Sequence, residues 1–210
     1  MSNDPNEPRL AESGPGSGAR AVVLVLPGGR VESTAASRRG PAYLRMVPFA
    51  RSIGRANRGR QVAVWLLRYR VRGWNGDAQD PVRDARWALA EARRRHPGAP
   101  IVLVGHSMGG RVALWLANEP GVAGVCALAP WIEPGDPAVH PTSATVLIAH
   151  GDHDRVTDPA ASVAYAARLG ASFVPVPGEV HGLVRRPVFW TRLVTGFVTS
   201  VLGSVESHAR

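Results

Sequence analysis

Short, mainly apolar runs recur along the chain, and the first of them, 21–26, is apolar at every position and stops at Pro27-Gly28-Gly29. Runs that are apolar at every position are typical of strands buried on both faces of a parallel sheet. We therefore expect six strands, at 21–26, 62–69, 101–104, 122–129, 145–149 and 172–176.

Segments with helical periodicity lie between these runs. Leu44, Phe49 and Ile53 give one segment an apolar stripe, while Asp80 and Asp158 each precede a proline, a pairing typical of a helix start. We expect helices at 41–57, 80–95, 158–169 and 187–202. A further helix is expected directly after the apolar run 101–104 and the glycine-containing turn 105–109. Strands that alternate with helices through short connections predict an α/β fold, a mostly parallel sheet with helices on both faces.

The length of 210 residues fits one domain with a single core. We expect this domain to span 21–203. Residues 1–20 are rich in proline, glycine, serine and charge, which predicts a disordered N-terminal tail, and 204–210 form a short C-terminal tail. Only 130–143 separate two of the predicted strands where an inserted domain could lie, so we expect no lid domain.

The lone cysteine, Cys126, excludes an intramolecular disulfide and is typical of a reducing compartment. No run approaches the ~20 apolar residues of a membrane span. The N-terminus lacks the basic start and apolar block of a secretory signal. These features predict a cytoplasmic protein without an integral membrane segment, and they leave the oligomeric state open.

The formal net charge is +9, and all of the basic residues are arginine. Ten arginines and no acidic residue occur within 38–72, which predicts a basic surface. Because no nucleic-acid-binding motif accompanies them, we expect no nucleic-acid partner. Whether this surface is merely solvated or contacts an anionic substrate, a lipid headgroup or an acidic partner stays open.

The sequence Gly105-His106-Ser107-Met108-Gly109 links an apolar run to a helical segment. A serine at such a sharp strand-to-helix turn adopts strained backbone geometry, so its neighbours must lack bulk. We interpret Ser107 as a nucleophile. The alternative is a glycine-rich turn whose serine only caps the helix.

This G-H-S-M-G-G segment resembles the nucleophile elbow of the α/β-hydrolase family, and the resemblance extends over nearly the whole chain after residue 20. The family places its triad in the order Ser, Asp or Glu, His. The segment H-G-D-H-D-R-V-T resembles the family's acid segment and implies Asp154 as the orienting acid. His181 follows the last strand, where the family keeps its base. Asp152, Glu133 and Asp136 are alternatives for the acid.

The resemblance also implies two backbone donors for a tetrahedral oxyanion. One is the N–H of Met108, directly after the nucleophile. The other comes from the loop after the first strand, where Pro27-Gly28-Gly29-Arg30 replaces the family's His-Gly pair. This alignment implies Gly29, with Arg30 as the alternative.

Three further residues are candidates for an acyl pocket because they lie on loops at the same end of the predicted sheet: Trp74, Trp131 and Val156. Ordinary core or rim packing is the alternative for each. The cluster of His150, Asp152, His153 and Asp154 is too compact in sequence for four ligands to converge on one metal ion. We therefore expect neither a metal nor a cofactor.

The short chain resembles small lidless esterases and the dienelactone hydrolase-like branch, although the latter uses cysteine where this chain has Ser107. This resemblance implies a serine hydrolase that cleaves small to medium carboxylic esters or thioesters through an acyl-enzyme. Its expected partner is a small-molecule ester. The alternatives are an acyltransferase, a lactonase or a carbon–carbon bond hydrolase with the same triad, or a catalytically silent binding protein.

Overall fold

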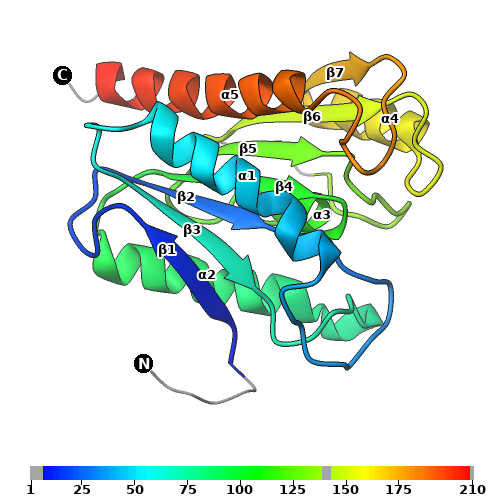
Figure 1. Ribbon diagram of the computed structural model, residues 1–210, viewed down its shortest axis with the longest axis horizontal. Helices are drawn as coiled ribbons and strands as arrows, with labels where there is room; N and C mark the ends of the chain where they lie inside the picture. The colour runs from blue at the N-terminus through cyan, green and yellow to red at the C-terminus, as the bar shows by residue number, and fades with distance from the viewer. Residues whose placement is uncertain (1–6, 139–142, 209–210) are drawn as a thin grey trace.

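The computed structural model describes residues 7–138 and 143–208. Its centre is one seven-stranded sheet in the order β1-β3-β2-β4-β5-β6-β7, in which every neighbouring pair is parallel except β1 and β3 (Figure 1). The strands are β1 (Arg9–Ser13), β2 (Ala21–Leu26), β3 (Val62–Arg68), β4 (Ile101–His106), β5 (Val122–Leu128), β6 (Thr145–Gly151) and β7 (Ser172–Val176). The predicted α/β class with a mostly parallel sheet is confirmed.

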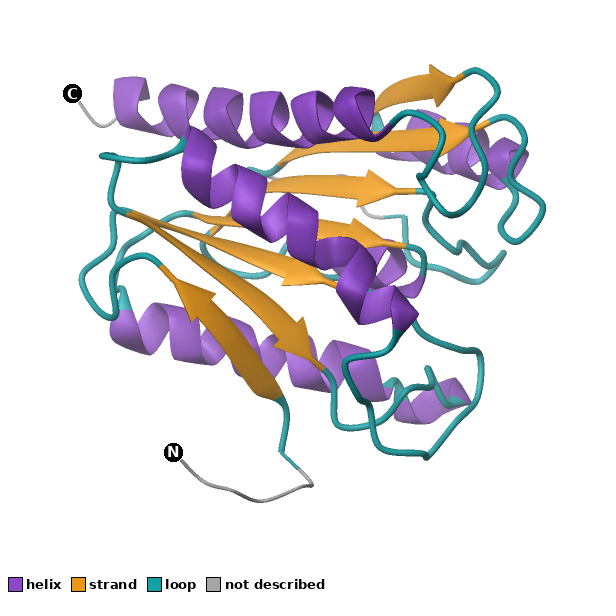
Figure 2. Cartoon of the chain, viewed as in Figure 1, coloured by secondary structure: helices purple, strands orange, loops and turns teal. Residues whose placement is uncertain are grey.

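Helices cover both faces of the sheet, as expected (Figure 2). One face carries α1 (Pro41–Ala56) and α5 (Pro187–His208), and the other carries α2 (Asp80–Arg95), α3 (Met108–Trp115) and α4 (Pro159–Leu169). A short 3-10 helix, η1 (Gly76–Ala78), precedes α2. Because the strand residues alternate between two separate apolar clusters, both faces of the central strands are buried.

Two predictions at the chain ends are wrong. Residues 9–13, expected within a disordered tail, form β1 and pair antiparallel with β3, so the sheet has seven strands instead of six. This edge strand has no apolar run because most of its side chains are exposed; backbone pairing and the ion pair between Glu12 and Arg95 hold it. At the other end, α5 continues to His208, through most of the expected tail. Residues 1–6 and 209–210 lie outside the described part.

Helix α5 also bears on the membrane prediction. Its portion Pro187–Ser207 is long and apolar enough to cross a membrane by length and composition alone. A core helix passes the same test, and in this fold Trp190, Val194 and Val198 are fully buried in the cluster between α5, α1 and the sheet. Packing against α1 and the sheet accounts for these buried residues, which belong to the 28% of the apolar window that is buried.

At its two edges the sheet ends in short strands. Beyond β6 the last strand is β7, which contains Pro175 opposite His150. A proline inside a strand is tolerated at a sheet edge, where its missing N–H faces away from the ladder.

The topology sets where a site can form. From β2 the chain passes to β3 on one side and then to β4 on the other, so the order of strands reverses between β2 and β4. Such a switch point opens a crevice at the carboxyl ends of the strands. The glycine-rich loop after β2 and Ser107 after β4 both lie there.

Candidate active site

Ser107 occupies the turn between β4 and α3 with φ 57° and ψ −121°, a strained conformation for a residue with a side chain. The flanking glycines permit this turn. A β-carbon on Gly105 would overlap the carbonyl oxygen of Gly109, and one on Gly109 would overlap the carbonyl oxygen of Leu26. The helix therefore begins in direct contact with the ends of β2 and β4, and the serine hydroxyl is raised above them.

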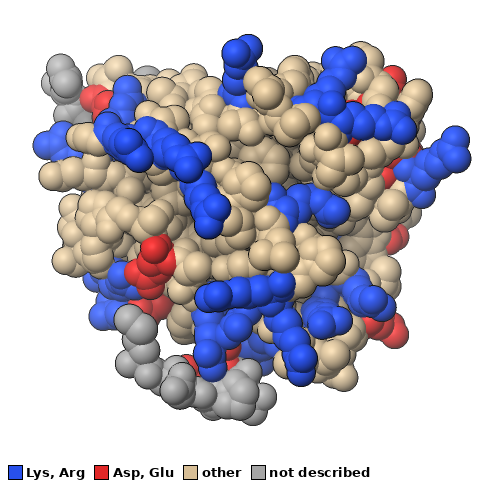
Figure 3. Space-filling view, viewed as in Figure 1, with Lys and Arg blue, Asp and Glu red and all other residues tan. Residues whose placement is uncertain are grey.

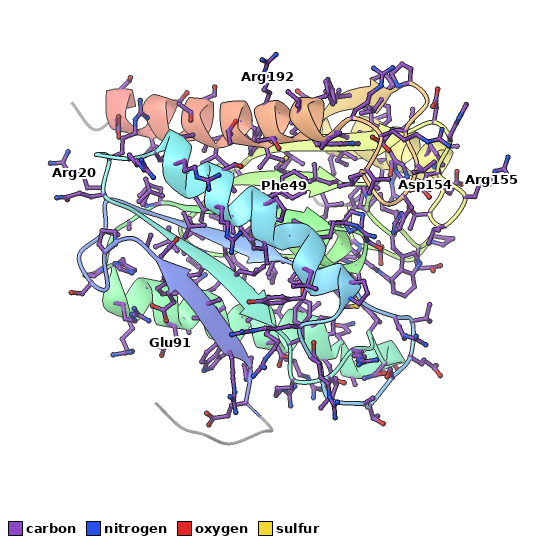
Figure 4. The ribbon with its side chains drawn as sticks, in the orientation of Figure 1. Arg20, Phe49, Glu91, Asp154, Arg155 and Arg192 are labelled. Atoms are coloured by element: carbon purple, nitrogen blue, oxygen red, sulfur yellow. The ribbon has the colours of Figure 1, made fainter. Side chains whose placement is uncertain are left out.

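The structure brings together the three residues that the sequence proposed as a triad. The Ser107 Oγ lies 3.0 Å from the His181 Nε2, and the His181 Nδ1 lies 2.7 Å from the Asp154 Oδ2. The residues come from the loops after β4, β7 and β6, at the edge toward which the strand arrows point; Asp154 is labelled there in Figure 4. With its proton on Nδ1, the imidazole can accept the serine proton at Nε2.

The Asp154 carboxylate accepts five hydrogen bonds although its side chain is buried. Oδ2 accepts from His181, from the Nε2 of His150 at 3.1 Å and from the hydroxyl of Thr157 at 2.9 Å. Oδ1 accepts from the backbone N–H groups of Val156 and Thr157. Burial by itself raises the pKa of Asp154, but these donors outweigh it and hold the pKa far below its usual range. The carboxylate is therefore ionised at neutral pH.

His150 and Thr157 contact the Asp154 carboxylate, and the sequence analysis assigned neither residue to this site. The His150 Nδ1 lies 2.7 Å from the hydroxyl of Ser162, which is fully buried on α4. A serine that donates to Nδ1 leaves the His150 Nε2–H to donate to Asp154. Their closeness to Asp154 in the sequence could have pointed to both residues, because all three lie within 150–157.

Backbone N–H groups that could bind an oxyanion lie next to Ser107. Met108 is the first residue of α3, so its N–H has no acceptor within the helix. A β-carbon on Gly28 would lie 3.3 Å from the Ser107 Cβ, so the glycine loop packs against the elbow. In that loop the Arg30 N–H donates to the Arg72 carbonyl at 2.9 Å, whereas the Gly29 N–H has no partner among the described residues. This favours Gly29 over Arg30 as the second donor.

Comparison with known proteins identifies the fold. A family model described as "Serine aminopeptidase, S33" matches residues 67–145, which is less than half of the chain. An α/β serine hydrolase homologue from Coxiella burnetii superposes with a TM-score of 0.68 at 17% identity, and the match covers 90% of each chain. This chain has the α/β-hydrolase fold.

Two further structures share the α/β-hydrolase fold. Est1E from Butyrivibrio proteoclasticus, solved with ferulic acid bound, gives a TM-score of 0.69 at 16% identity over 93% of this chain and 96% of that one. A serine hydrolase without a lid from Xanthomonas campestris gives 0.65 at 18% identity, over 92% and 88%. A search of curated proteins finds no significant match.

Behind the elbow of this α/β-hydrolase fold, His106 supports the loop that carries His181. The His106 Nε2 lies 2.9 Å from the backbone carbonyl of His181, and the two rings are 4.8 Å apart. Burial, and then the neighbouring His181, lower the pKa of His106 to about 3. His106 is therefore neutral, and because a carbonyl only accepts, its proton lies on Nε2.

If His181 acts as the general base, we expect His106→Ala to lower kcat by about 10- to 100-fold with a smaller change in KM, because a small displacement of a catalytic group is costly. His96→Ala is the matched control, since His96 is also buried but accepts a hydrogen bond from Ala19, before β2. Steady-state kinetics and thermal unfolding of both variants test this. Equal losses of kcat in the two would contradict a positioning role for His106.

A buried carboxylate anchors the same loop. Glu179 is fully buried and accepts from the indole N–H of Trp190 at 2.9 Å and from three backbone N–H groups, those of Val180, Arg185 and Arg186. Burial alone raises the pKa of Glu179, but these donors lower it overall. The loop that presents His181 is thus tied to the start of α5.

The acyl-pocket assignments of Trp74, Trp131 and Val156 stay predictions, although Trp74 and Trp131 both pack against a buried arginine. Trp74 is only 5% exposed, and the guanidinium of Arg111 lies 4.0 Å from its ring and 4.3 Å from that of Trp131. These rings cover the buried ion pair between Arg111 and Asp136. Val156 is 71% exposed and lines a cavity of about 590 Å³ that also contacts His181 and Asp154.

The alternative acids have other partners. Asp136 binds Arg111, Glu133 accepts from the indole of Trp131, and Asp152 accepts from the Gly178 N–H at 2.6 Å. Asp158 caps α4 through the Ala160 N–H. Within residues 7–138 and 143–208, no group of three or more His, Cys, Asp or Glu side chains is arranged to hold a metal ion.

Proposed function

We propose that this chain is a serine hydrolase that cleaves small to medium carboxylic esters or thioesters through an acyl-enzyme. The observation that carries the proposal is the uninterrupted series of hydrogen bonds from the Ser107 hydroxyl through His181 to the buried Asp154 carboxylate. A serine hydroxyl is a weak nucleophile until a positioned base accepts its proton, and this series supplies that base.

In the proposed reaction, the Ser107 Oγ attacks the ester carbonyl carbon while its proton passes to the His181 Nε2. The N–H groups of Gly29 and Met108 bind the negative oxygen of the tetrahedral intermediate. Collapse of the intermediate breaks the ester bond, and His181 returns the proton to the leaving alcohol or thiol. Water then attacks the acyl-serine with His181 as base, which releases the acid and restores Ser107.

The ionised Asp154 supports this cycle in two ways. It accepts the Nδ1–H of His181, which leaves Nε2 free to accept a proton, and its negative charge stabilises the imidazolium that forms during each half-reaction. Two histidines and one threonine share the same carboxylate oxygen, so its position relative to His181 is fixed before substrate binds.

The comparisons support esters as the class of substrate, and they do not identify one particular ester. The Xanthomonas campestris protein is described as a serine hydrolase without a lid, and the Butyrivibrio proteoclasticus protein holds ferulic acid. In this chain only residues 129–144 connect β5 and β6, which is too short for an inserted domain. We therefore propose an open site whose activity on dissolved esters does not need a lipid interface.

A fluorophosphonate probe tests the proposal directly, because it reacts covalently with an activated serine. We expect one probe per chain, attached at Ser107 and detected by mass spectrometry of tryptic peptides. Denatured protein is the control, since unfolding separates Ser107 from His181. Absence of labelling in the folded protein, or attachment at another serine, would overturn the assignment.

A further inference from the structure

A cavity of about 320 Å³ lies beside the glycine loop, and its charged lining consists of arginine. Gly28 and Gly29 form part of its wall. The charged residues that line it are Arg30, Arg38, Arg45 and Arg72, and the described lining contains no acidic residue. The hydroxyl of Tyr69, another lining residue, is buried and has no hydrogen-bond partner among the described residues.

The cavity adjoins the reacting groups. Its wall residue Gly28 is close enough to Ser107 that an added β-carbon would lie 3.3 Å from the serine Cβ. On the other side, the Arg45 Nη2 lies 3.8 Å from where a β-carbon on Gly182 would be, directly after His181. The cavity therefore lies next to the turn that carries Ser107 and the loop that carries His181, although neither of these two residues lines it.

The cavity arginines lack counter-charges. None of the four forms an ion pair with a described Asp or Glu, although arginines elsewhere, such as Arg70 and Arg95, do. Basic side chains far outnumber acidic ones on the face that carries α1 and the loop before it (Figure 3). An unneutralised positive cavity attracts anions and lowers the free energy of an anion bound inside it.

The pocket wall is held in place by backbone hydrogen bonds between the loops after β2 and β3. Arg30 N donates to the Arg72 carbonyl at 2.9 Å, Arg72 N to the Ala35 carbonyl at 3.1 Å, and Ser37 N to the Arg70 carbonyl at 2.9 Å. The Arg70 side chain is itself fixed by Asp80 and Asp84. Arginines on a braced frame lose less conformational entropy when they bind a ligand than arginines on a free loop.

We propose that this cavity binds an anionic group of the substrate, so that the preferred substrates are esters or thioesters carrying a carboxylate or a phosphate. The planar guanidinium fork matches either group through two parallel N–H···O bonds. The inference rests on the proposed hydrolase function, and it specifies that the substrate carries a negative charge.

Matched substrate pairs test the inference. Mono-4-nitrophenyl glutarate is compared with its methyl ester, and 2-(butyryloxy)ethyl phosphate with its dimethyl phosphate triester, after subtraction of the rate without enzyme. We expect kcat/KM to be about tenfold or more higher for at least one anionic member, the gain typical of a charged hydrogen bond, and to fall toward the neutral value in 0.5 M NaCl. The arm with the larger ratio distinguishes carboxylate from phosphate.

Variants locate the effect. Arg45→Gln and Arg72→Gln should each reduce the anionic-to-neutral ratio by about three- to tenfold, since each removes a charged donor. Arg192→Gln removes the same charge from an exposed position on α5, labelled in Figure 4, and should leave the ratio unchanged. A wild-type ratio near one, with the neutral esters still cleaved, would overturn the anion site and leave the proposed hydrolase intact.

A binding measurement keeps the two proposals separate. Titration of Ser107→Ala with glutarate and with inorganic phosphate, followed by calorimetry, needs no turnover. We expect saturable binding of at least one anion, weakened by a further Arg45→Gln change. If neither anion binds, the inference about the cavity is wrong, whatever the fluorophosphonate result.

Discussion

Replacing Ser107 with alanine is expected to lower kcat/KM for 4-nitrophenyl butyrate by on the order of 10⁶-fold, the loss typical of removing a triad nucleophile. The change deletes only the Oγ that contacts His181. The backbone already holds a residue with a β-carbon at φ 57°, so alanine brings no larger side chain into the turn.

The control is Ser207→Ala, which removes a hydroxyl from an exposed position on α5 and should leave activity unchanged. Circular dichroism and thermal unfolding verify that both variants fold as the wild type does. Retention of more than a few per cent of turnover by a folded Ser107→Ala would rule out Ser107 as the nucleophile.

Replacing Asp154 with asparagine is expected to lower kcat by on the order of 10⁴-fold, because the neutral amide no longer fixes the tautomer of His181 or stabilises its imidazolium. It should also destabilise the protein at neutral pH. Both oxygens of the Asp154 carboxylate accept hydrogen bonds. In asparagine an NH₂ group replaces one of these oxygens, and because NH₂ cannot accept, the N–H groups that face it lose their acceptor.

The pH dependence of stability gives an independent readout for the same variant. Because the folded state lowers the pKa of Asp154, its stabilising contribution is complete above the unfolded pKa of about 3.9 and declines as the pH falls below it toward the folded pKa. The difference in unfolding free energy between wild type and Asp154→Asn, from urea titrations, should therefore be largest near pH 7 and shrink below about pH 4.

Asp158→Asn is the matched control for both measurements. Asp158 is exposed and caps α4, and asparagine caps a helix about as well as aspartate does. We expect no loss of kcat and no change in the pH profile. A similar loss in both variants would show that the effect of Asp154 is not specific to its contacts with His181 and His150.

The parts of the fold that depend on long apolar runs were predictable from sequence. Strands such as β2 and β4 are buried on both faces. Short continuous apolar runs are typical of such strands, so the sequence indicates them directly. The edge strand β1 was missed because its stability comes from pairing with β3, and backbone pairing leaves no apolar signature.

The phase of helix α1 was harder to predict. Leu44 was expected in its apolar stripe and is 55% exposed, whereas Tyr43 and Met46 face the sheet. Apolar side chains occur around most of this helix, so the sequence alone does not indicate which face is buried. The sheet and α5 select that face through packing.

In the candidate site, too, some residues could be predicted from the sequence and others could not. Ser107, Asp154 and His181 stand out because motifs and their order restrict where a triad can lie. His150, Thr157 and Arg45 do not, because their contacts depend on how separate loops meet at the edge of the sheet. Arg45 and the loop that carries His181 are far apart in the sequence, so their closeness in the fold could not be predicted from spacing along the chain.

The proline in β7 has a consequence for behaviour at high concentration. An exposed strand edge can recruit a strand from another molecule and so start aggregation. Pro175 removes a donor from the outer edge of β7, and the opposite edge, β1, presents the charged side chains of Arg9 and Glu12. Both ends of the sheet thus oppose the addition of a further strand, which protects a chain with so apolar an interior from edge-to-edge association.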